Sequence, residues 1–288
     1  MIAEQASQVI DVFRRRVYAG QIERVVTKLG LQSYLSSAYW TVILALADDT
    51  HTRTVAEVDA TFKITTPHEY NRFHDPSIKG ETEILEAVLS DLDAEDVFYD
   101  IGANVGLYTC FAEHKTTDGT VVAFEPHPGN VERIKENVDL NGITATVCEV
   151  ALAEEDGSAS LEVREDVTGV VGNVSKGTDS AELVQLPIDL RNGDGMVEQG
   201  EIPVPDIVKI DVDGGEADVV RGLADTLGHP DCRSIYCEIH PGALEEYGAS
   251  AEGVREVLEE AGFELERMEV EHQMRKDAYF IFGNKRSE

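Results

Sequence analysis

From about residue 94 onward, short apolar runs alternate with stretches of helical periodicity. The apolar runs predict strands over 96–101, 120–125, 145–150, 207–211, 234–239, 263–269 and 278–282. Helical spacing predicts helices over 106–115, 129–141 and 251–261. This alternation is typical of an α/β fold with a seven-stranded, mostly parallel sheet. We expect the last strand to be antiparallel, because the short loop before it cannot form a parallel crossover.

The chain before this alternation has a different character. Residues 1–49 show helical spacing, and the apolar run Ala38–Ala47 predicts a buried helix. Residues 53–72 alternate and are rich in β-branched residues, which predicts a hairpin that turns around Asp59. We therefore divide the chain into an N-terminal helical and hairpin extension (1–80) and a main domain (81–288). Within the main domain, about 153–204 reads as an insertion rich in Gly, Ser, Thr and Asp.

The first strand of the main domain ends in a glycine turn. Asp100 closes the apolar run, and Gly102, Asn104 and Gly106 follow before a helix begins. A dinucleotide-binding turn has a third glycine and places a pyrophosphate on the helix N-terminus, where Asp100 would repel it. A carboxylate there suits a cationic ligand without phosphate. The turn therefore favours S-adenosylmethionine, which carries a sulfonium and an ammonium group.

A second acidic residue ends the next predicted strand. Glu125 follows the apolar run 121–124, where a carboxylate can accept hydrogen bonds from both ribose hydroxyls of a nucleoside. Dinucleotide-binding folds share this feature. Two alternatives therefore stay open: a nicotinamide-dependent oxidoreductase, and a non-catalytic nucleoside-binding module of the same fold.

Polar residues also gather at the ends of the later strands. Lys209 and Asp211 share one face of a predicted strand, and Glu238 and His240 share one face of the next. We expect all four at the carboxyl edge of the sheet, beside the bound nucleoside. His240 is the candidate general base for a substrate hydroxyl, and Lys209 would orient Asp211 or hold a substrate oxygen. The alternative is an ion-pair network that only fixes loops.

The sequence assigns no metal ligand. Asp211 and Asp213 could bind Mg²⁺ or pair with Lys209, so metal dependence stays open. Asn192–Val197 resembles the middle of a calcium-binding EF-hand loop, but the first ligand position would fall on Leu190, and a Gly-rich turn is expected instead. The four cysteines lack zinc-ligand spacing and suggest buried thiols in a reducing compartment.

Together these motifs resemble the FkbM-type family of S-adenosylmethionine-dependent methyltransferases. The matching segments are Asp100–Gly106, Phe124–Pro126, Ala151–Ala153 with Asp156–Gly157, Lys209–Glu216 and Glu238–His240. The resemblance implies a Rossmann-like class I methyltransferase that methylates a hydroxyl of a small molecule, sugar or glycan. It also implies that Gly102, Asn104 and Gly106 approach the methionine moiety. Glu125 with Pro126 would hold the ribose, and Val150 or Ala151 the adenine edge. Asp213 departs from the glutamate usual in the family.

The charge of the chain then limits its partners. There are 56 Asp plus Glu against 24 Lys plus Arg, a formal net charge of -32. Such a chain repels nucleic acid and anionic membranes at ordinary salt. Salt near 1 M screens charges over about 3 Å, so the composition indicates an extreme halophile. No signal peptide or membrane-spanning segment is recognised, which predicts a cytoplasmic protein without membrane insertion. Oligomeric state stays open, with a homodimer as one option.

Overall fold

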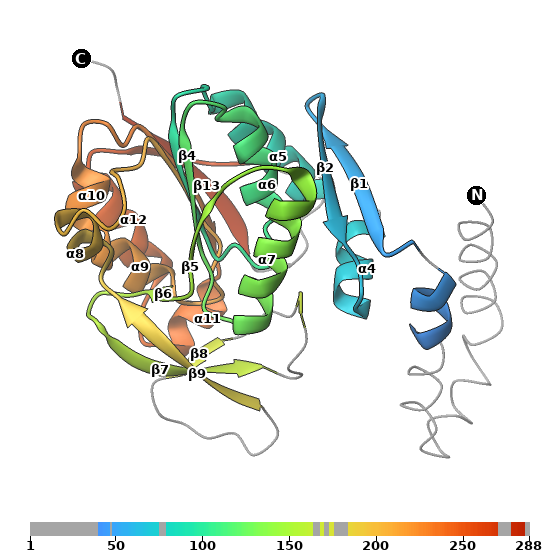
Figure 1. Cartoon of the computed structure of the whole chain (residues 1–288). Helices are drawn as coiled ribbons and strands as arrows, with labels where there is room; N and C mark the ends of the chain where they lie inside the picture. Colours follow the sequence, from blue (N-terminus) through green and yellow to red (C-terminus); the bar gives the residue numbers. More distant parts are fainter. Residues whose placement is uncertain are drawn as a thin grey trace.

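The central feature of the computed structural model is a seven-stranded sheet (Figure 1). The structure describes residues 40–46, 48–74, 79–163, 168–169, 173–175, 184–269 and 278–285. The strands lie in the order β12-β13-β11-β10-β3-β4-β5. Their bounds are β3 Val97–Ile101, β4 Thr120–Phe124, β5 Thr146–Cys148, β10 Ile207–Ile210, β11 Ser234–Ile239, β12 Glu264–Arg267 and β13 Tyr279–Asn284. Only the pairs that include β13 are antiparallel, so the predicted sheet is confirmed.

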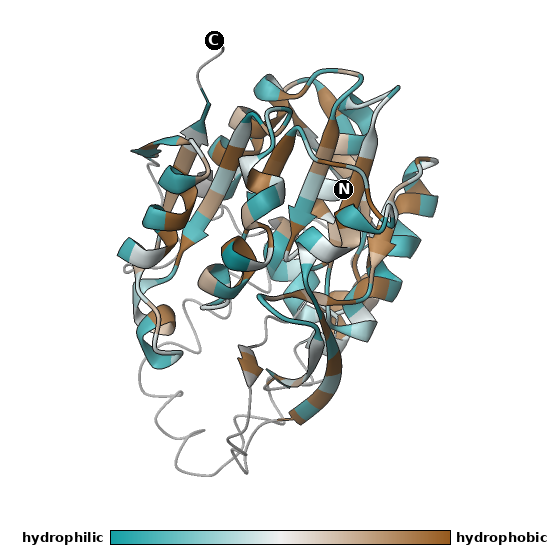
Figure 2. Cartoon of the chain, turned by 90° about the vertical axis from the view of Figure 1, so that its left-hand side faces the viewer, coloured by the Kyte–Doolittle hydropathy of each residue, from teal (hydrophilic) through white to brown (hydrophobic). Residues whose placement is uncertain are grey.

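Helices cover both faces of this sheet and enclose two hydrophobic cores. One face carries α5 (Lys79–Asp91), α6 (Leu107–Lys115) and α7 (Pro128–Asn141). The other carries α9 (Glu216–Gly222), α10 (Ala224–Gly228) and α12 (Ala251–Glu260), while α8 (Gly193–Glu198) and α11 (Pro241–Glu246) are short. Figure 2 shows long hydrophobic stretches in the strands and mixed helix surfaces. Burial on both faces explains why the parallel strands read as continuous apolar runs.

The ends of α7 show how local sequence sets element boundaries. His127 Nδ1 accepts a hydrogen bond from the Asn130 amide at 3.2 Å, and Pro128 occupies the first turn, where its missing N–H costs nothing. Gly142 closes the helix with a φ of 66°, as expected of a C-cap glycine. The helix predicted over 129–141 is therefore confirmed.

The N-terminal extension contains the predicted hairpin, but its turn lies elsewhere. Strands β1 (Thr50–Val55) and β2 (Val58–Lys63) are joined by Ala56 and Glu57, whose φ angles are 48° and 65°. Asp59 is not in the turn, because it pairs with Thr54 across the ladder. This register turns Phe62 into the core, where it is fully buried. Burial of the apolar face overrides the turn preference of aspartate.

The apolar run before the hairpin also differs from expectation. Residues 40–46 are helical, but Ile43 is their only buried side chain, whereas Val42 and Leu46 are exposed. The expectation of a buried helix is therefore wrong for this part. The rest of the helical prediction, residues 1–39, lies outside the described residues.

A buried ion pair joins the extension to the main sheet's helices. Glu69 in α4 (Pro67–His74) is fully buried and lies 3.2 Å from Arg133 of α7. The Glu69 carboxylate also accepts hydrogen bonds from the Thr65 and Thr66 amides. Breaking a buried pair of this kind leaves an uncompensated charge, so the contact fixes α4 against the body of the protein.

The predicted insertion forms a second, four-stranded sheet in the order β6-β9-β7-β8. Its strands are β6 Ala151–Leu152, β7 Gly157–Val163, β8 Asn173–Ser175 and β9 Val184–Arg191. Figure 1 places this sheet beyond the carboxyl end of the central strands. The expected turn at 192–197 is instead the helix α8, because the Asn192 side chain accepts a hydrogen bond from the Gly195 amide and caps it. The division of the chain into two domains stays a prediction.

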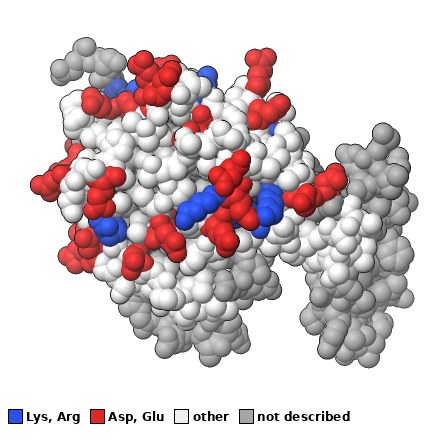
Figure 3. Space-filling model, in the orientation of Figure 1, with Lys and Arg blue, Asp and Glu red and all other residues white. Residues whose placement is uncertain are grey.

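The surface is strongly acidic, as the composition requires. On the face in Figure 3, Asp and Glu are spread over the described surface and clearly outnumber Lys and Arg. Among the described residues, no helix has the length and hydrophobicity to cross a membrane.

Candidate active site

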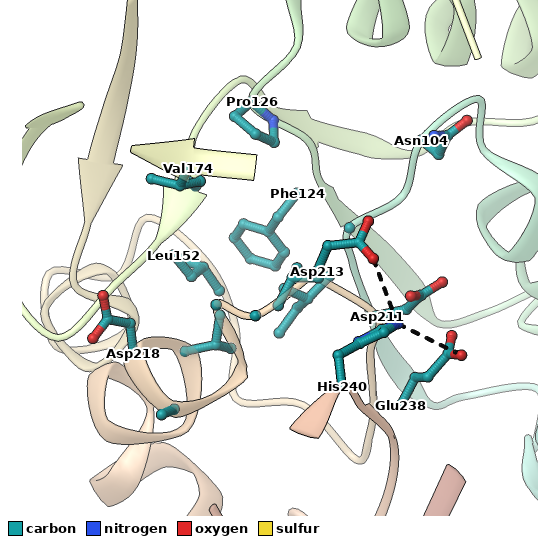
Figure 4. Close-up of a pocket in the computed structure, with 18 of the residues that line it drawn as sticks. Asn104, Phe124, Pro126, Leu152, Val174, Asp211, Asp213, Asp218, Glu238 and His240 are labelled. Atoms are coloured by element: carbon teal, nitrogen blue, oxygen red, sulfur yellow. Dashed lines mark ion pairs between the residues drawn. The ribbon is translucent and has the colours of Figure 1, made fainter. Parts of the chain in front are cut away.

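A pocket opens at the carboxyl edge of β3, β4, β10 and β11, beneath the small sheet (Figure 4). Parallel sheets of this kind bind ligands at this edge. On one side lie Gly102, Asn104 and Glu125, which we call the glycine-turn side. On the other lie Asp211, Asp213, Glu238 and His240, which we call the carboxylate side.

The glycine turn is fixed by main-chain contacts. Gly102 has a φ of 75°, and a Cβ there would lie 2.0 Å from the Asp211 carbonyl oxygen, so only glycine fits. The amides of Gly102 and Ala103 donate to the Phe124 carbonyl at 3.0 and 3.1 Å. Asn104 also has a positive φ, 52°, which few non-glycine residues adopt. The turn is therefore packed tightly against the ends of β4 and β10, and its residues Gly102 and Asn104 line the pocket.

Glu125 closes the glycine-turn side and is held in place by amides. Its Oε2 accepts a hydrogen bond from the Asn104 amide at 2.8 Å, and Oε1 accepts one from the His127 amide at 2.9 Å. Burial raises the pKa of Glu125 to about 7, although these hydrogen bonds oppose the shift. A nearly buried carboxylate at the end of the second strand suits the two hydroxyls of a ribose.

Asp100 does not line the pocket, contrary to the expected contact with the ligand. It is fully buried, accepts hydrogen bonds from the Thr109 amide and hydroxyl, and lies 3.1 Å from Lys209 Nζ. Lys209 is equally buried and donates to the Gly102 carbonyl at 3.1 Å. Burial would lower the pKa of Lys209, but the charges of Asp100 and Asp211 raise it, so the ammonium stays charged. The pair supports the turn from below, which excludes direct contact of either side chain with a substrate in this conformation.

The carboxylate side brings together three of the four predicted catalytic residues. One carboxylate oxygen of Asp211, one of Glu238 and one ring nitrogen of His240 lie within 4.8 Å of one another. Burial and the charge of Asp211 raise the pKa of Glu238 to about 8. Burial would also raise the pKa of Asp211, but Lys209, 3.7 Å away, lowers it. The proton shared by Glu238 and Asp211 is therefore held mainly by Glu238, while Asp211 stays ionised.

Glu216, which the sequence did not single out, fixes His240. The fully buried Glu216 carboxylate lies 2.6 Å from His240 Nδ1 and accepts a hydrogen bond from the His240 amide at 3.2 Å. Burial would lower the pKa of His240, but Glu216 and Glu238 raise it to about 9. At neutral pH this imidazole is already protonated, so its predicted role as general base does not fit the structure.

The remaining predicted residues divide between the pocket and its support. Pro126, Val150 and Ala151 line the pocket. Gly106 does not; it precedes α6 with a φ of 82° and lies near Ile134. The structure therefore does not place Gly106 against the ligand, as the resemblance implied. Gly106 instead forms the N-cap of α6.

Several pocket residues were missed because they come from distant parts of the chain. Arg72 and Glu81 reach the pocket from α4 and α5, and their side chains lie 2.5 Å apart. Tyr247 follows α11, and Tyr279 begins β13. No local motif marks these positions. Only Glu216 carried a signal, as the last residue of the matched segment Lys209–Glu216.

The strand order and the glycine turn leading to a strand-end glutamate define a class I, S-adenosylmethionine-dependent methyltransferase. The residues present fit this cofactor, because Gly102, Asn104 and Glu125 all line the pocket and the Glu125 carboxylate lies at the end of the second strand, where a ribose is bound. The chain belongs to the family of the Methyltransferase FkbM domain, which matches residues 100–265. Family membership decides against the nicotinamide-dependent alternative.

Individual proteins similar to this chain include two relatives and one solved structure. The hexuronic acid methyltransferase AglP of Haloferax volcanii is 28% identical over 237 residues, which cover 81% of this chain and 90% of AglP. The 31-O-demethyl-FK506 methyltransferase FkbM of Streptomyces tacrolimicus is 28% identical over 192 residues, covering 57% of this chain and 73% of that protein. A crystal structure of a methyltransferase FkbM from Methylobacillus flagellatus is 14% identical, with a TM-score of 0.43, covering 76% of this chain and 50% of that one.

Proposed function

We propose that this protein transfers a methyl group from S-adenosylmethionine to a hydroxyl of a hexuronic acid, carried on a small molecule or a glycan. The carboxylate side of the pocket carries the proposal, because it places acidic groups beside the glycine turn, where a hydroxyl can be held and deprotonated. The relative named as a hexuronic acid methyltransferase, matched over most of both chains, supports the acceptor class.

The reaction is a displacement at carbon. The acceptor oxygen bonds to the methyl carbon that S-adenosylmethionine supplies, while the carbon–sulfur bond breaks and its electron pair stays on sulfur. The hydroxyl proton must leave as the new bond forms. His240 is cationic at neutral pH, so a carboxylate of the carboxylate side takes this proton. Gly102, Asn104 and Glu125 hold the donor so that the two reactants meet in line.

Arg72 is our candidate for the acceptor's carboxylate. It lines the pocket, and among the described residues its Nε has no hydrogen-bond partner although it is buried. A guanidinium binds a carboxylate through two parallel hydrogen bonds, so one edge paired with Glu81 leaves further N–H groups for a ligand.

The test compares a glucuronoside with the matching glucoside, with methylation read by mass spectrometry in molar KCl. We expect the wild type to methylate the glucuronoside. Arg72→Gln should raise the KM for the glucuronoside by roughly 10- to 100-fold, because the variant loses a hydrogen bond to a charged group. Arg255→Gln, which removes an arginine paired with Glu259 outside the pocket, is the control. Equal use of both sugars by the wild type would contradict the hexuronic acid assignment.

The acidic surface supports our proposal that the protein works in concentrated salt. The same negative charge disfavours nucleic acid as a partner. We place the protein in a cytoplasm. At a net charge of -32, self-repulsion opposes folding unless salt screens it. Methyl transfer is therefore expected to be highest in molar KCl and to fall steeply at 0.1 M. Full activity at low salt would count against a halophilic setting.

A further inference from the structure

The carboxylate side is arranged as a metal site as well as an acidic one. Asp211, Glu238 and His240 come from the ends of two adjacent strands, and Figure 4 shows them pointing toward one another. One oxygen or nitrogen of each lies within 4.8 Å of the others. Ligand atoms on opposite sides of an ion with bonds of about 2.0–2.2 Å stand about 4 to 4.5 Å apart. The three side chains thus need to move only slightly to share one ion.

The environment of His240 is a second, independent sign. Its side chain is 6% exposed, and Nδ1 is bound by the buried Glu216 carboxylate at 2.6 Å. Histidines that bind metals are oriented in this way, with one ring nitrogen held by a carboxylate and the other directed at the ion. Here Nε2 faces Asp213 and Glu238 at 3.5 and 3.7 Å, longer than hydrogen bonds. The ring is therefore fixed with Nε2 directed into the acidic group.

The local charge also favours a cation. Asp211, Asp213, Glu216 and Glu238 bring four carboxyl groups to His240 and Lys209. Lys209 already balances the buried Asp100, 3.1 Å away. A divalent ion would remove the remaining excess of negative charge at the place where the acceptor hydroxyl must lie.

We propose that Asp211, Glu238 and His240 bind one divalent cation, which holds and acidifies the acceptor hydroxyl. The ion displaces the proton from His240 Nε2 when it binds, while Nδ1–H stays bound to Glu216. Two carboxylate oxygens and an imidazole nitrogen suit Mn²⁺ better than Mg²⁺, which prefers oxygen alone. Bound to such an ion, the hydroxyl loses its proton more readily. Asp213 is then the pocket-lining carboxylate that takes the proton while the oxygen bonds to the methyl carbon. This role of the ion rests on the proposed methyl transfer.

The test measures Mn²⁺ binding directly, without an acceptor. The full chain is freed of metal with a chelator, returned to molar KCl and titrated with Mn²⁺ while electron paramagnetic resonance follows the free ion. We expect the wild type to bind Mn²⁺ at one site. The affinity of this site should fall by at least tenfold in Glu238→Gln and in Asp211→Asn. Glu216→Gln keeps all three ligands and should weaken binding by about 10- to 100-fold, because it frees the His240 ring.

A matched control separates this site from general attraction to an acidic surface. Glu256→Gln removes one exposed carboxylate of α12 that is not among the residues lining the pocket, and this variant should bind Mn²⁺ as the wild type does. Spin-echo modulation from an imidazole nitrogen should appear in the wild type and vanish in His240→Gln. This readout keeps the test valid if a carboxylate variant fails to fold.

Titration of S-adenosylhomocysteine on the same samples distinguishes the two proposals. If it binds but Mn²⁺ does not, or if Mn²⁺ binds without nitrogen modulation and equally well in Glu238→Gln, the metal site is wrong and the methyl transfer stands. If S-adenosylhomocysteine itself fails to bind the wild type, the proposed function is wrong.

Discussion

The two sides of the pocket are built by different means. On the glycine-turn side, main-chain groups define the shape: Gly102 has a left-handed backbone, and the Glu125 carboxylate is held by amides. On the carboxylate side, titratable side chains define the site, with Asp211, Glu238 and His240 sharing one acidic space. Only the first side is fixed by backbone geometry.

This difference predicts which kind of change each side of the pocket is sensitive to. A main-chain site keeps its shape unless the backbone is strained, so on the glycine-turn side a change of pH should act through the Glu125 carboxylate alone. A site of coupled side chains keeps its backbone when one member is replaced, but its protonation and ligand binding change together. The following four predictions test this contrast, from the largest expected effect to the smallest.

Gly102→Ala should have the largest effect, because the new methyl group would overlap the Asp211 carbonyl. We expect more than a 100-fold loss in affinity for S-adenosylhomocysteine, measured by calorimetry. The matched control is Gly142→Ala, where φ is also positive, 66°, but where no described residue beyond the adjoining chain lies within 4 Å of the new Cβ. It should cost only about 1 kcal/mol of stability. Equal effects of the two changes would show that close approach is not what constrains Gly102.

His240→Gln should act on turnover and spare cofactor binding. Loss of a group that positions or activates the acceptor typically reduces rates by about 10²- to 10⁴-fold. We expect kcat to fall by about 10²-fold, at the lower end of this range, while the affinity for S-adenosylhomocysteine changes less than threefold. A parallel loss of both would show that the two sides are not separable in the way their geometry indicates.

Cofactor binding should depend on pH through Glu125, whose pKa lies at about 7 in the free protein. If ribose hydroxyls donate to the carboxylate, only the ionised form binds well. Affinity for S-adenosylhomocysteine should then be constant above pH 7 and fall about tenfold for each pH unit below it. Glu125→Gln should bind about tenfold more weakly at pH 8 and lose this dependence. A flat profile in the wild type would contradict the assignment of Glu125.

Thr109→Val should have the smallest effect on function. It removes the hydroxyl that donates to Asp100 at 2.7 Å, while the Thr109 amide still donates. A buried hydrogen bond to a charged group is worth about 1.5–3 kcal/mol, so thermal unfolding should occur at a lower temperature. Affinity for S-adenosylhomocysteine should change less than threefold. A large loss of affinity would return Asp100 to the direct role that its burial argues against.

The main sheet was predictable from the sequence because buried parallel strands are marked by continuous apolar runs. The pattern 207–210 predicts β10 even though Lys209 interrupts it, since its neighbours are apolar. The hairpin turn was not predictable, because Ala56 and Glu57 are poor turn residues and adopt positive φ only to keep Phe62 in the core.

The pocket was predictable where motif and strand end coincide, as at Asn104, Glu125 and Asp211. The sequence could not show which strand-end polar groups face the pocket. Asp100 and Lys209 satisfy each other below it, and this depends on three-dimensional packing. Arg72 could not be found either, because its place beside the pocket follows from how α4 packs against α7.

The contact of the Gly102 backbone with the Asp211 carbonyl has a consequence for how new specificities arise in this scaffold. Because the Gly102 backbone packs against the Asp211 carbonyl with no room for a side chain, a backbone shift at either strand end must be matched by a shift at the other. Diversification must come from the periphery, from α4 with Arg72, the segment at Tyr247 and the small sheet above the pocket. Grafting these pieces from a relative is therefore the direct way to redesign the acceptor without disturbing the donor.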